Sequence, residues 1–96
     1  MTDVDSRPKV ALIVGAGDAT GGAIARRFAR EGLTACMTRR SADKLEPLVQ
    51  SLRAEGLQAH GFASDARKEE DVVALVERIE NEVGPIEVFE IGRAHV

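Results

Sequence analysis

The sequence lacks tyrosine and tryptophan and has a single cysteine, Cys36, and two histidines. One cysteine cannot form an internal disulfide, and its place in an apolar run predicts a buried, unreactive thiol. His60 and His95 stand apart, without neighbours at the spacing of metal ligands. The pattern therefore predicts no metal site.

No apolar run approaches the length of a membrane-spanning helix, and the polar first residues, MTDVDSRPK, do not resemble a signal peptide. There is also no basic block for nucleic acid, because the net charge is −3 and charges of both signs are spread along the chain. The 96 residues, 44% of them hydrophobic, suffice for one small folded domain. We therefore expect a cytoplasmic globular protein without nucleic-acid or membrane partners.

The most informative stretch is KVALIVGAGDATGGAIARRFAR, residues 9–30. Its apolar start, Val10–Val14, predicts a buried strand, and an apolar helical pattern follows over 24–28. Between them lie four glycines: Gly15, Gly17, Gly21 and Gly22. A strand, a glycine turn and a helix in this order place a helix N-terminus, with unpaired N–H groups and partial positive charge, where a phosphate can bind.

The glycine spacing lies between two nucleotide-binding templates. The pattern G-x-G-x-x-G fits Gly15 and Gly17 but meets Thr20 at its third position. The pattern T-G-x-x-x-G-x-G fits Gly15 and Gly21 but meets Ala19 at its middle glycine. We favour nucleotide binding. The alternative is a strand-to-helix turn that needs small residues only for packing.

The rest of the chain predicts strands over 33–38, 57–63 and from 86 to 89. Helices are expected over about 19–31, from a cap at Ser41 to before Gly56, and from a cap at Ser64 or Asp65 to Gly84. Alternating strands and helices with right-handed crossovers predict an α/β fold, half of a doubly wound Rossmann fold. Its parallel sheet would have about four strands in the order 3-2-1-4, with three helices. Residues 1–8 would be a flexible tail and 9–89 the domain.

Arg39 and Arg40 follow the second predicted strand. In such folds an acid at this point binds both ribose hydroxyls of NAD, whereas an arginine favours a 2′-phosphate. A charge-assisted hydrogen bond contributes roughly 1.5–3 kcal/mol, so one well-placed guanidinium selects the phosphate. The pair therefore favours NADP(H) over NAD(H). An ordinary solvated turn is the alternative.

Asp65 follows the third predicted strand, in Phe62-Ala63-Ser64-Asp65. A carboxylate at the carboxyl end of that strand is placed to accept a hydrogen bond from the amino group of adenine. It is equally well placed to cap the third helix, and one role does not exclude the other.

Together these segments resemble the N-terminal part of a short-chain dehydrogenase/reductase. The matching segments, in the family's order over residues 9–88, are VALIVGAGDATGGAIARRFAREG, TRRSADKL, SDARKEEDV and VGPIEV. The resemblance implies hydride transfer between NADP(H) and a carbonyl or alcohol by a homo-oligomeric parent enzyme. It also implies a set of cofactor-binding residues: Gly15, Gly17, Ala19, Thr20 and Gly21 at the pyrophosphate, Arg39 and Arg40 at the 2′-phosphate, and Asp65 at the adenine.

Two substitutions in the glycine turn depart from the family's pattern. Ala19 adds a methyl group where the family has a glycine, and Asp18 adds a negative charge. Both lower the expected affinity for the cofactor.

The family's catalytic residues are a serine, a tyrosine and a lysine three positions beyond the tyrosine, and this sequence has no tyrosine. We therefore expect the chain itself to be catalytically inactive. A non-catalytic nucleotide-binding or regulatory module is the alternative function. Half of a flavin-binding Rossmann protein is a third interpretation, which Arg39 and Arg40 disfavour.

The last residues, 90–96, read EIGRAHV. This string resembles the translation of a common sequencing-library adapter that ends at a stop codon, so we expect a non-native tail and a native gene that continues past about Phe89. A true short protein whose tail matches by coincidence is the alternative. A long DNA read that retained this segment and its stop would contradict the hypothesis. In the whole enzyme the fourth strand would lie in the middle of the sheet, whereas in this chain it would form an exposed apolar edge. We therefore expect the chain to be marginally stable or to self-associate.

Overall fold

The computed structural model describes residues 7–15 and 19–91. Its elements follow one another in the order β1 (Val10–Val14), α1 (Ala19–Arg30), β2 (Thr34–Arg39), the 3-10 turn η1 (Ala42–Leu45), α2 (Glu46–Ala54), β3 (Ala59–Ala63), α3 (Glu69–Glu82) and β4 (Ile86–Ile91).

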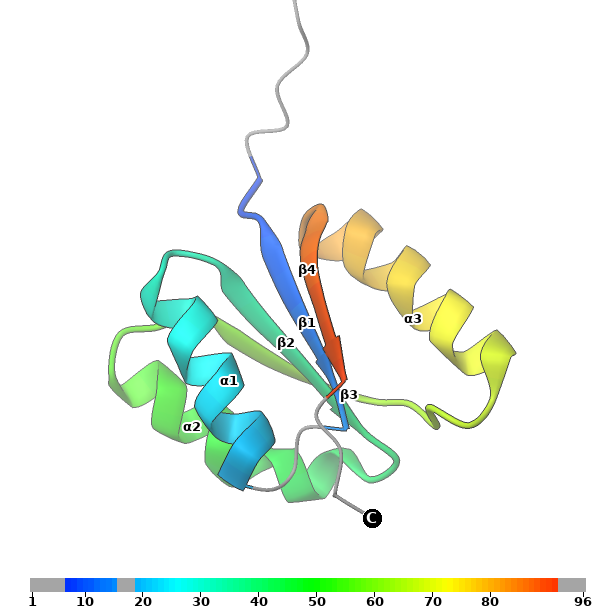
Figure 1. The fold of residues 1–96 in the computed structure, drawn as a ribbon, viewed down its shortest axis with the longest axis horizontal. Coiled ribbons are helices and arrows are strands. Elements are labelled where there is room, and N and C mark those ends of the chain that lie inside the picture. Colours follow the sequence, from blue (N-terminus) through cyan, green and yellow to red (C-terminus); the bar gives the residue numbers. More distant parts are fainter. Residues whose placement is uncertain (1–6, 16–18, 92–96) are drawn as a thin grey trace, which may run out of the picture.

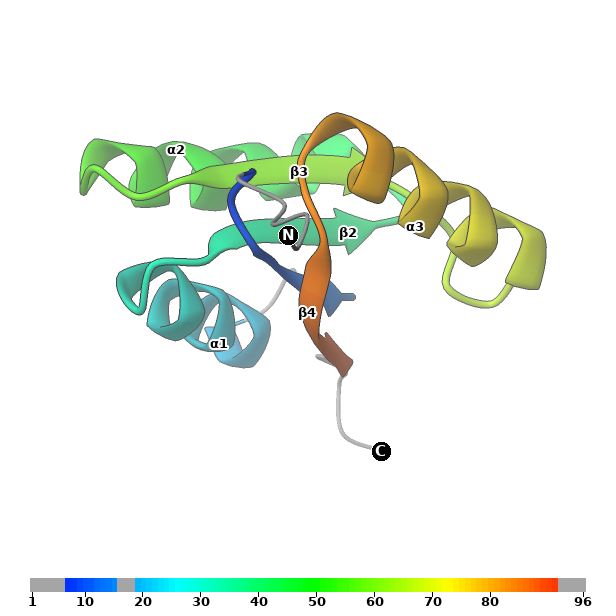
Figure 2. The same cartoon turned by 90° about the horizontal axis from the view of Figure 1, so that it is seen from above.

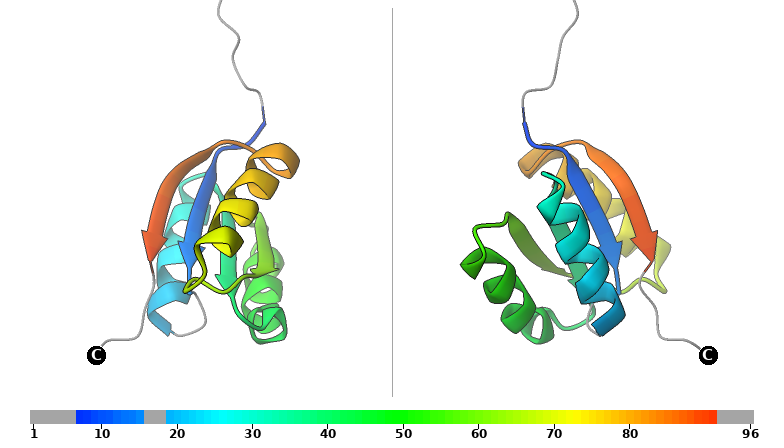
Figure 3. Two further views of the ribbon diagram at one scale, coloured as in Figure 1. Left: turned by 90° about the vertical axis from the view of Figure 1, so that its right-hand side faces the viewer. Right: turned by 60° about the vertical axis from the view of Figure 1, so that its left-hand side comes forward.

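The four strands form one parallel sheet in the order β3-β2-β1-β4, which confirms the predicted topology. Helices α1 and α2 cover one face of the sheet and α3 covers the other, as the views in Figures 1, 2 and 3 agree. The layers explain why each helix has only one apolar stripe. Among the described helices, none has the length and apolarity needed to cross a membrane.

Strand β1 is buried on both faces, and each of its residues is at most 5% exposed. Ala11 and Ile13 face the cluster beneath α1 and α2, whereas Val10, Leu12 and Val14 face the cluster beneath α3. A central parallel strand has no solvent-facing side, so its sequence is a continuous apolar run. Cys36 on β2 is also fully buried, and burial raises the pKa of its thiol to about 12, which confirms the predicted buried thiol.

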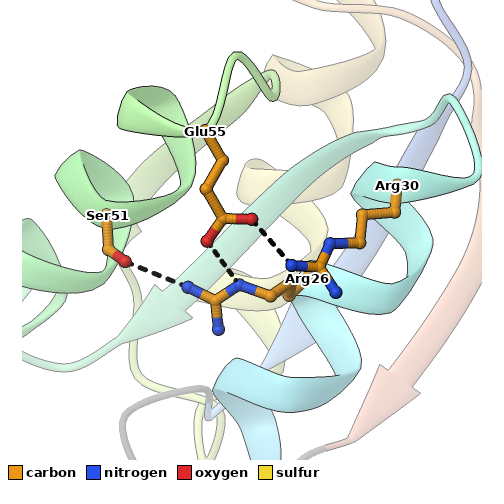
Figure 4. Close-up of polar contacts among 4 residues, drawn as sticks. All are labelled: Arg26, Arg30, Ser51 and Glu55. Atoms are coloured by element: carbon orange, nitrogen blue, oxygen red, sulfur yellow. Dashed lines mark hydrogen bonds and ion pairs between the residues drawn. The ribbon is translucent and has the colours of Figure 1, made fainter.

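Helices α1 and α2 lie close together. A Cβ atom at Gly22 would stand 3.3 Å from a methyl carbon of Leu48, so the glycine permits the close approach. Polar contacts join the same helices (Figure 4). The carboxylate of Glu55 accepts hydrogen bonds from Arg26 at 2.8 Å and from Arg30 at 3.0 Å.

The second predicted helix begins later than expected. Ser41 precedes the 3-10 turn η1 and makes no side-chain capping bond, whereas α2 begins at Glu46 with Pro47 in its first turn. Proline has no N–H group, and the first turn of a helix does not need one. Pro47 therefore lies in the first turn of α2, where it is tolerated.

Strand β4 extends to Ile91, two residues beyond the predicted end of the domain. Its register against β1 shifts between Val10 and Ala11, and Glu90 then pairs with Ile13. The side chains of Phe89 and Ile91 are 48% and 61% exposed. The adapter hypothesis for residues 90–96 stays a prediction, and residues 92–96 lie outside the described residues.

Candidate functional site

The candidate site lies at the edge of the sheet where the parallel strands end. Strand β1 leads into Gly15, β2 into Arg40 and β3 into Ser64, while α1 begins at the same edge (Figure 1, lower side of the sheet). Parallel strands bring their carboxyl ends together, so segments distant in the sequence become neighbours here.

Gly15 adopts a left-handed backbone conformation, with φ at 80°. Its N–H group donates to the carbonyl oxygen of Thr38 at 2.9 Å, which ties the turn to the end of β2. A side chain would be strained in this conformation, so the turn needs glycine here. Gly21 is buried within α1. Gly17 lies outside the described residues, and Ala19 and Thr20 are described only by their place in the first turn of α1.

A basic hollow of about 400 Å³ opens after β2 and is lined by Arg39, Arg40, Ser41 and Lys44. Among the described residues that line it, none is acidic. Sequence reasoning identified Arg39 and Arg40 but missed Lys44. The sequence indicated Lys44 only through its position four residues after Arg40, and the geometry of the turn between them could not be predicted.

A second, mixed hollow of about 280 Å³ is lined by Arg40, Ala63, Ser64, Asp65 and Asp71. Arg40 lines both hollows, so the two are neighbours at the sheet edge. The structure therefore brings together Arg40 and Asp65, which are 25 residues apart in the sequence. The buried hydroxyl oxygen of Ser64 has no hydrogen-bond partner among the described residues.

The Asp65 carboxylate is held by Arg67. Its Oδ1 accepts from the Arg67 backbone N–H at 3.0 Å and from Arg67 Nε at 3.1 Å, and its Oδ2 accepts from Arg67 Nη2 at 3.1 Å. These contacts lower the pKa of the Asp65 carboxyl to about 2, with a smaller contribution from the charge of Arg40. The carboxylate is therefore ionised at neutral pH.

The alternative role of Ser64 or Asp65 as the cap of the third helix is wrong. Helix α3 begins at Glu69 with Lys68 as its N-cap residue, and no side chain makes a capping bond there. The Asp65 carboxylate instead closes a local turn on the N–H of Arg67, two residues on. The intervening turn delays the helix by about one turn relative to the prediction.

Acid should weaken the fold through Asp65 and Glu55. Arg67 lowers the pKa of Asp65 from 3.8 to about 2, and hydrogen bonds from Arg30 and Arg26 lower the pKa of Glu55. The unfolded chain then binds protons at a higher pH than the folded one, so the free energy of unfolding falls as the pH drops below about 4. Urea unfolding at several pH values measures this decline. The Asp65→Asn variant should decline less, and a flat wild-type profile would contradict the assignment.

Comparison with known proteins identifies the family. Residues 9–92 match the sequence model of the short chain dehydrogenase family. The chain belongs to this family. The 2,3-dihydro-2,3-dihydroxybenzoate dehydrogenase of Bacillus subtilis is 39% identical to it over 81 residues, which cover 84% of this chain and 31% of that enzyme.

Solved short-chain dehydrogenases share the fold. One from Rhodopseudomonas palustris superposes with a TM-score of 0.83 at 36% identity and covers 92% of this chain and 42% of its own. A variant of actinorhodin polyketide ketoreductase, solved with NADPH, also gives a TM-score of 0.83, at 32% identity, and covers 92% of this chain and 34% of its own. The chain thus spans about a third to two fifths of the length of these relatives. Their shared features are an oxidoreductase function and a Rossmann-type nucleotide-binding fold.

Among the described residues, no group of three or more histidine, cysteine or acidic side chains is arranged to hold a metal ion. His60 lies at the outer strand β3, where its Nδ1 is 3.4 Å from a guanidinium nitrogen of Arg53. Burial and the charge of Arg53 lower the pKa of His60.

Proposed function

We propose that this chain is the NADP(H)-binding part of a cytoplasmic short-chain dehydrogenase whose whole protein transfers hydride between NADP(H) and a carbonyl or alcohol. The observation that carries the proposal is the basic hollow at the end of β2, lined by Arg39, Arg40 and Lys44. Three cationic side chains at this position suit the two negative charges of a 2′-phosphate, for which the ribose of NAD has no counterpart. The NADPH recorded in the related ketoreductase supports the same choice.

The remaining residues of the site fit the rest of the dinucleotide. The pyrophosphate would lie at the start of α1 beside Gly15 and Gly21. Gly17, Ala19 and Thr20 would also belong to this pyrophosphate site. The adenine amino group would donate to Oδ2 of Asp65, which accepts one hydrogen bond from Arg67 and has room for another. The nicotinamide of the bound cofactor would supply or accept the hydride.

Turnover requires residues that this sequence does not contain. The sequence has no tyrosine, so the family's acid/base residue would come from elsewhere in a whole dehydrogenase. The expected property of this chain is therefore binding without turnover. A non-catalytic nucleotide-binding or regulatory module remains the second candidate function, and the same missing tyrosine favours it.

Titration of the purified chain with NADPH and with NADH, followed by cofactor fluorescence and by the melting temperature, tests the proposal. We expect both to bind, with NADPH at least tenfold tighter, because one charge-assisted contact alone accounts for about this ratio. Equal affinities would overturn the choice of NADP(H). Binding of neither dinucleotide would overturn the function itself.

Lys44 offers a test of the basic hollow that does not involve the two arginines. The Lys44→Gln substitution should weaken NADPH binding roughly three- to tenfold and leave NADH binding unchanged, because an exposed charge contributes modestly. The NADPH affinities of wild type and of the variant should differ less at physiological salt than at low salt, because salt screens the charge of Lys44. An equal effect on both dinucleotides would remove Lys44 from the 2′-phosphate site.

The exposed edge at β4 should make the isolated chain self-associate. Phe89 and Ile91 are about half and more than half exposed, and the outer backbone groups of β4 have no neighbouring strand in the sheet. Sedimentation velocity at increasing protein concentration should show growing oligomers. A Phe89→Lys variant should shift the population toward monomer, whereas a concentration-independent monomer with a sharp melt would contradict the prediction. The homo-oligomeric state proposed for the whole dehydrogenase is a separate question.

A further inference from the structure

The mixed hollow is lined by more negative than positive side chains, which is unfavourable for the proposed binding of a phosphate nearby. Among the residues that line it, two are carboxylates, Asp65 and Asp71, and one is a guanidinium, Arg40. Arg40 also lines the basic hollow, where the 2′-phosphate is proposed to bind. Two carboxylates close to this point would repel a doubly negative phosphate, and the repulsion would offset the gain from Arg40.

Arg67 is paired with one of these two carboxylates. Its guanidinium makes a two-point contact with the Asp65 carboxylate, with both nitrogen–oxygen distances at 3.1 Å. The Asp65 side chain is only 15% exposed, so its charge is poorly screened by water, whereas Arg67 is 71% exposed. The Asp71 carboxylate also faces this segment, because its Oδ2 accepts a hydrogen bond from the backbone N–H of Asp65 at 3.3 Å.

We propose that Arg67 is a specificity-determining residue, which neutralises Asp65 so that a dinucleotide with a 2′-phosphate is accepted beside Arg40. This inference rests on the proposed function and adds to it a residue outside the pair that would contact the phosphate. Arg67 acts through Asp65 and is therefore a positioning residue. The two-point contact also fixes the orientation of the carboxylate, which leaves Oδ2 with room to accept from the adenine.

The test compares dissociation constants for NADPH and NADH in wild type and four variants. Arg67→Gln should weaken NADPH binding roughly three- to tenfold and NADH binding less than twofold, since only NADPH carries the phosphate. Arg67→Lys keeps the charge and should keep the wild-type preference. Arg78→Gln is the matched control, because Arg78 lies on α3, paired with Glu82, and lines neither hollow.

The double variant Asp65→Asn with Arg67→Gln separates charge compensation from direct contact. It removes both members of the pair, so the preference for NADPH over NADH should return to within about twofold of wild type. A preference that stays as low as in Arg67→Gln would overturn the inference, because it would place Arg67 on the phosphate itself. Equal losses for both dinucleotides in Arg67→Gln, or a loss in Arg67→Lys, would also overturn it.

The same measurements distinguish this inference from the proposed function. If Arg67→Gln fails to fold, as judged by circular dichroism, a changed preference in Arg67→Lys or in the double variant would still overturn the inference. If wild type binds neither dinucleotide, the proposed function fails and this inference fails with it. If wild type prefers NADPH and the variants do not follow the expected order, only the inference fails.

Discussion

Replacing Arg40 with glutamine should raise the dissociation constant of NADPH roughly ten- to a hundredfold and change that of NADH little. Among the described residues, Arg40 alone lines both the basic and the mixed hollow, beside the proposed sites of the phosphate and the adenine. A hydrogen bond between two charged groups contributes roughly 1.5–3 kcal/mol, which corresponds to this range. Fluorescence titration with each dinucleotide measures the effect.

A charge-matched control belongs with the Arg40 experiment. Arg27 lies on α1, is largely exposed and pairs with Glu31, and it lines neither hollow. Arg27→Gln changes the net charge by the same amount and should leave both dissociation constants within about twofold of wild type. A similar loss in both variants would show a general effect of net charge. Retention of tight NADPH binding in Arg40→Gln would contradict the proposed 2′-phosphate site.

Replacing Gly84 with alanine should cost about 2–3 kcal/mol of unfolding free energy, typical of steric overpacking at a site that must shift to admit a new methyl group. The added Cβ atom would overlap the carbonyl oxygen of Pro8. The backbone around Pro8 is tethered, because Val10 donates to the carbonyl of Pro85 at 2.8 Å and Arg7 donates to the carbonyl of Glu80 at 2.6 Å. Urea unfolding of wild type and variant measures the difference.

Removing the obstructing residues provides the control for Gly84→Ala. In a variant without residues 1–8 the methyl group meets no Pro8 carbonyl, so the same substitution should cost less than about 1 kcal/mol. The cost in the two backgrounds therefore isolates the contact with Pro8. An equal cost in both would place the defect in the turn between α3 and β4 and not in this contact.

The fold and its family followed from the sequence because they depend on local and periodic features. A continuous apolar run such as Val10–Val14, followed by a glycine turn and a helix, is typical of a strand in the middle of a parallel sheet with both faces covered. Alternation with helices and the handedness of crossovers then leave few strand orders, and the order 3-2-1-4 is the one found. The glycine turn predicted at Gly15 is found with the left-handed conformation that only glycine adopts readily.

The helix starts were less accessible from sequence. Ser41 and Asp65 are both good capping residues by type, yet neither caps the helix that follows it. A short 3-10 turn intervenes after Ser41, and the contact of Asp65 with Arg67 intervenes before α3. Local side-chain hydrogen bonds compete with helix capping, and their balance depends on the surrounding chain.

By itself, the sequence determined the parallel sheet, the family and the residue types at the end of each strand. Only the tertiary structure decided which of those residues meet. Lys44 joins the arginines because η1 turns the chain back toward β2, and Arg40 meets Asp65 because neighbouring parallel strands end at one edge. Arg67 lies beside the site through its two-point contact with Asp65. Charge complementarity depends on distance, and the distance between residues far apart in the sequence is set by packing.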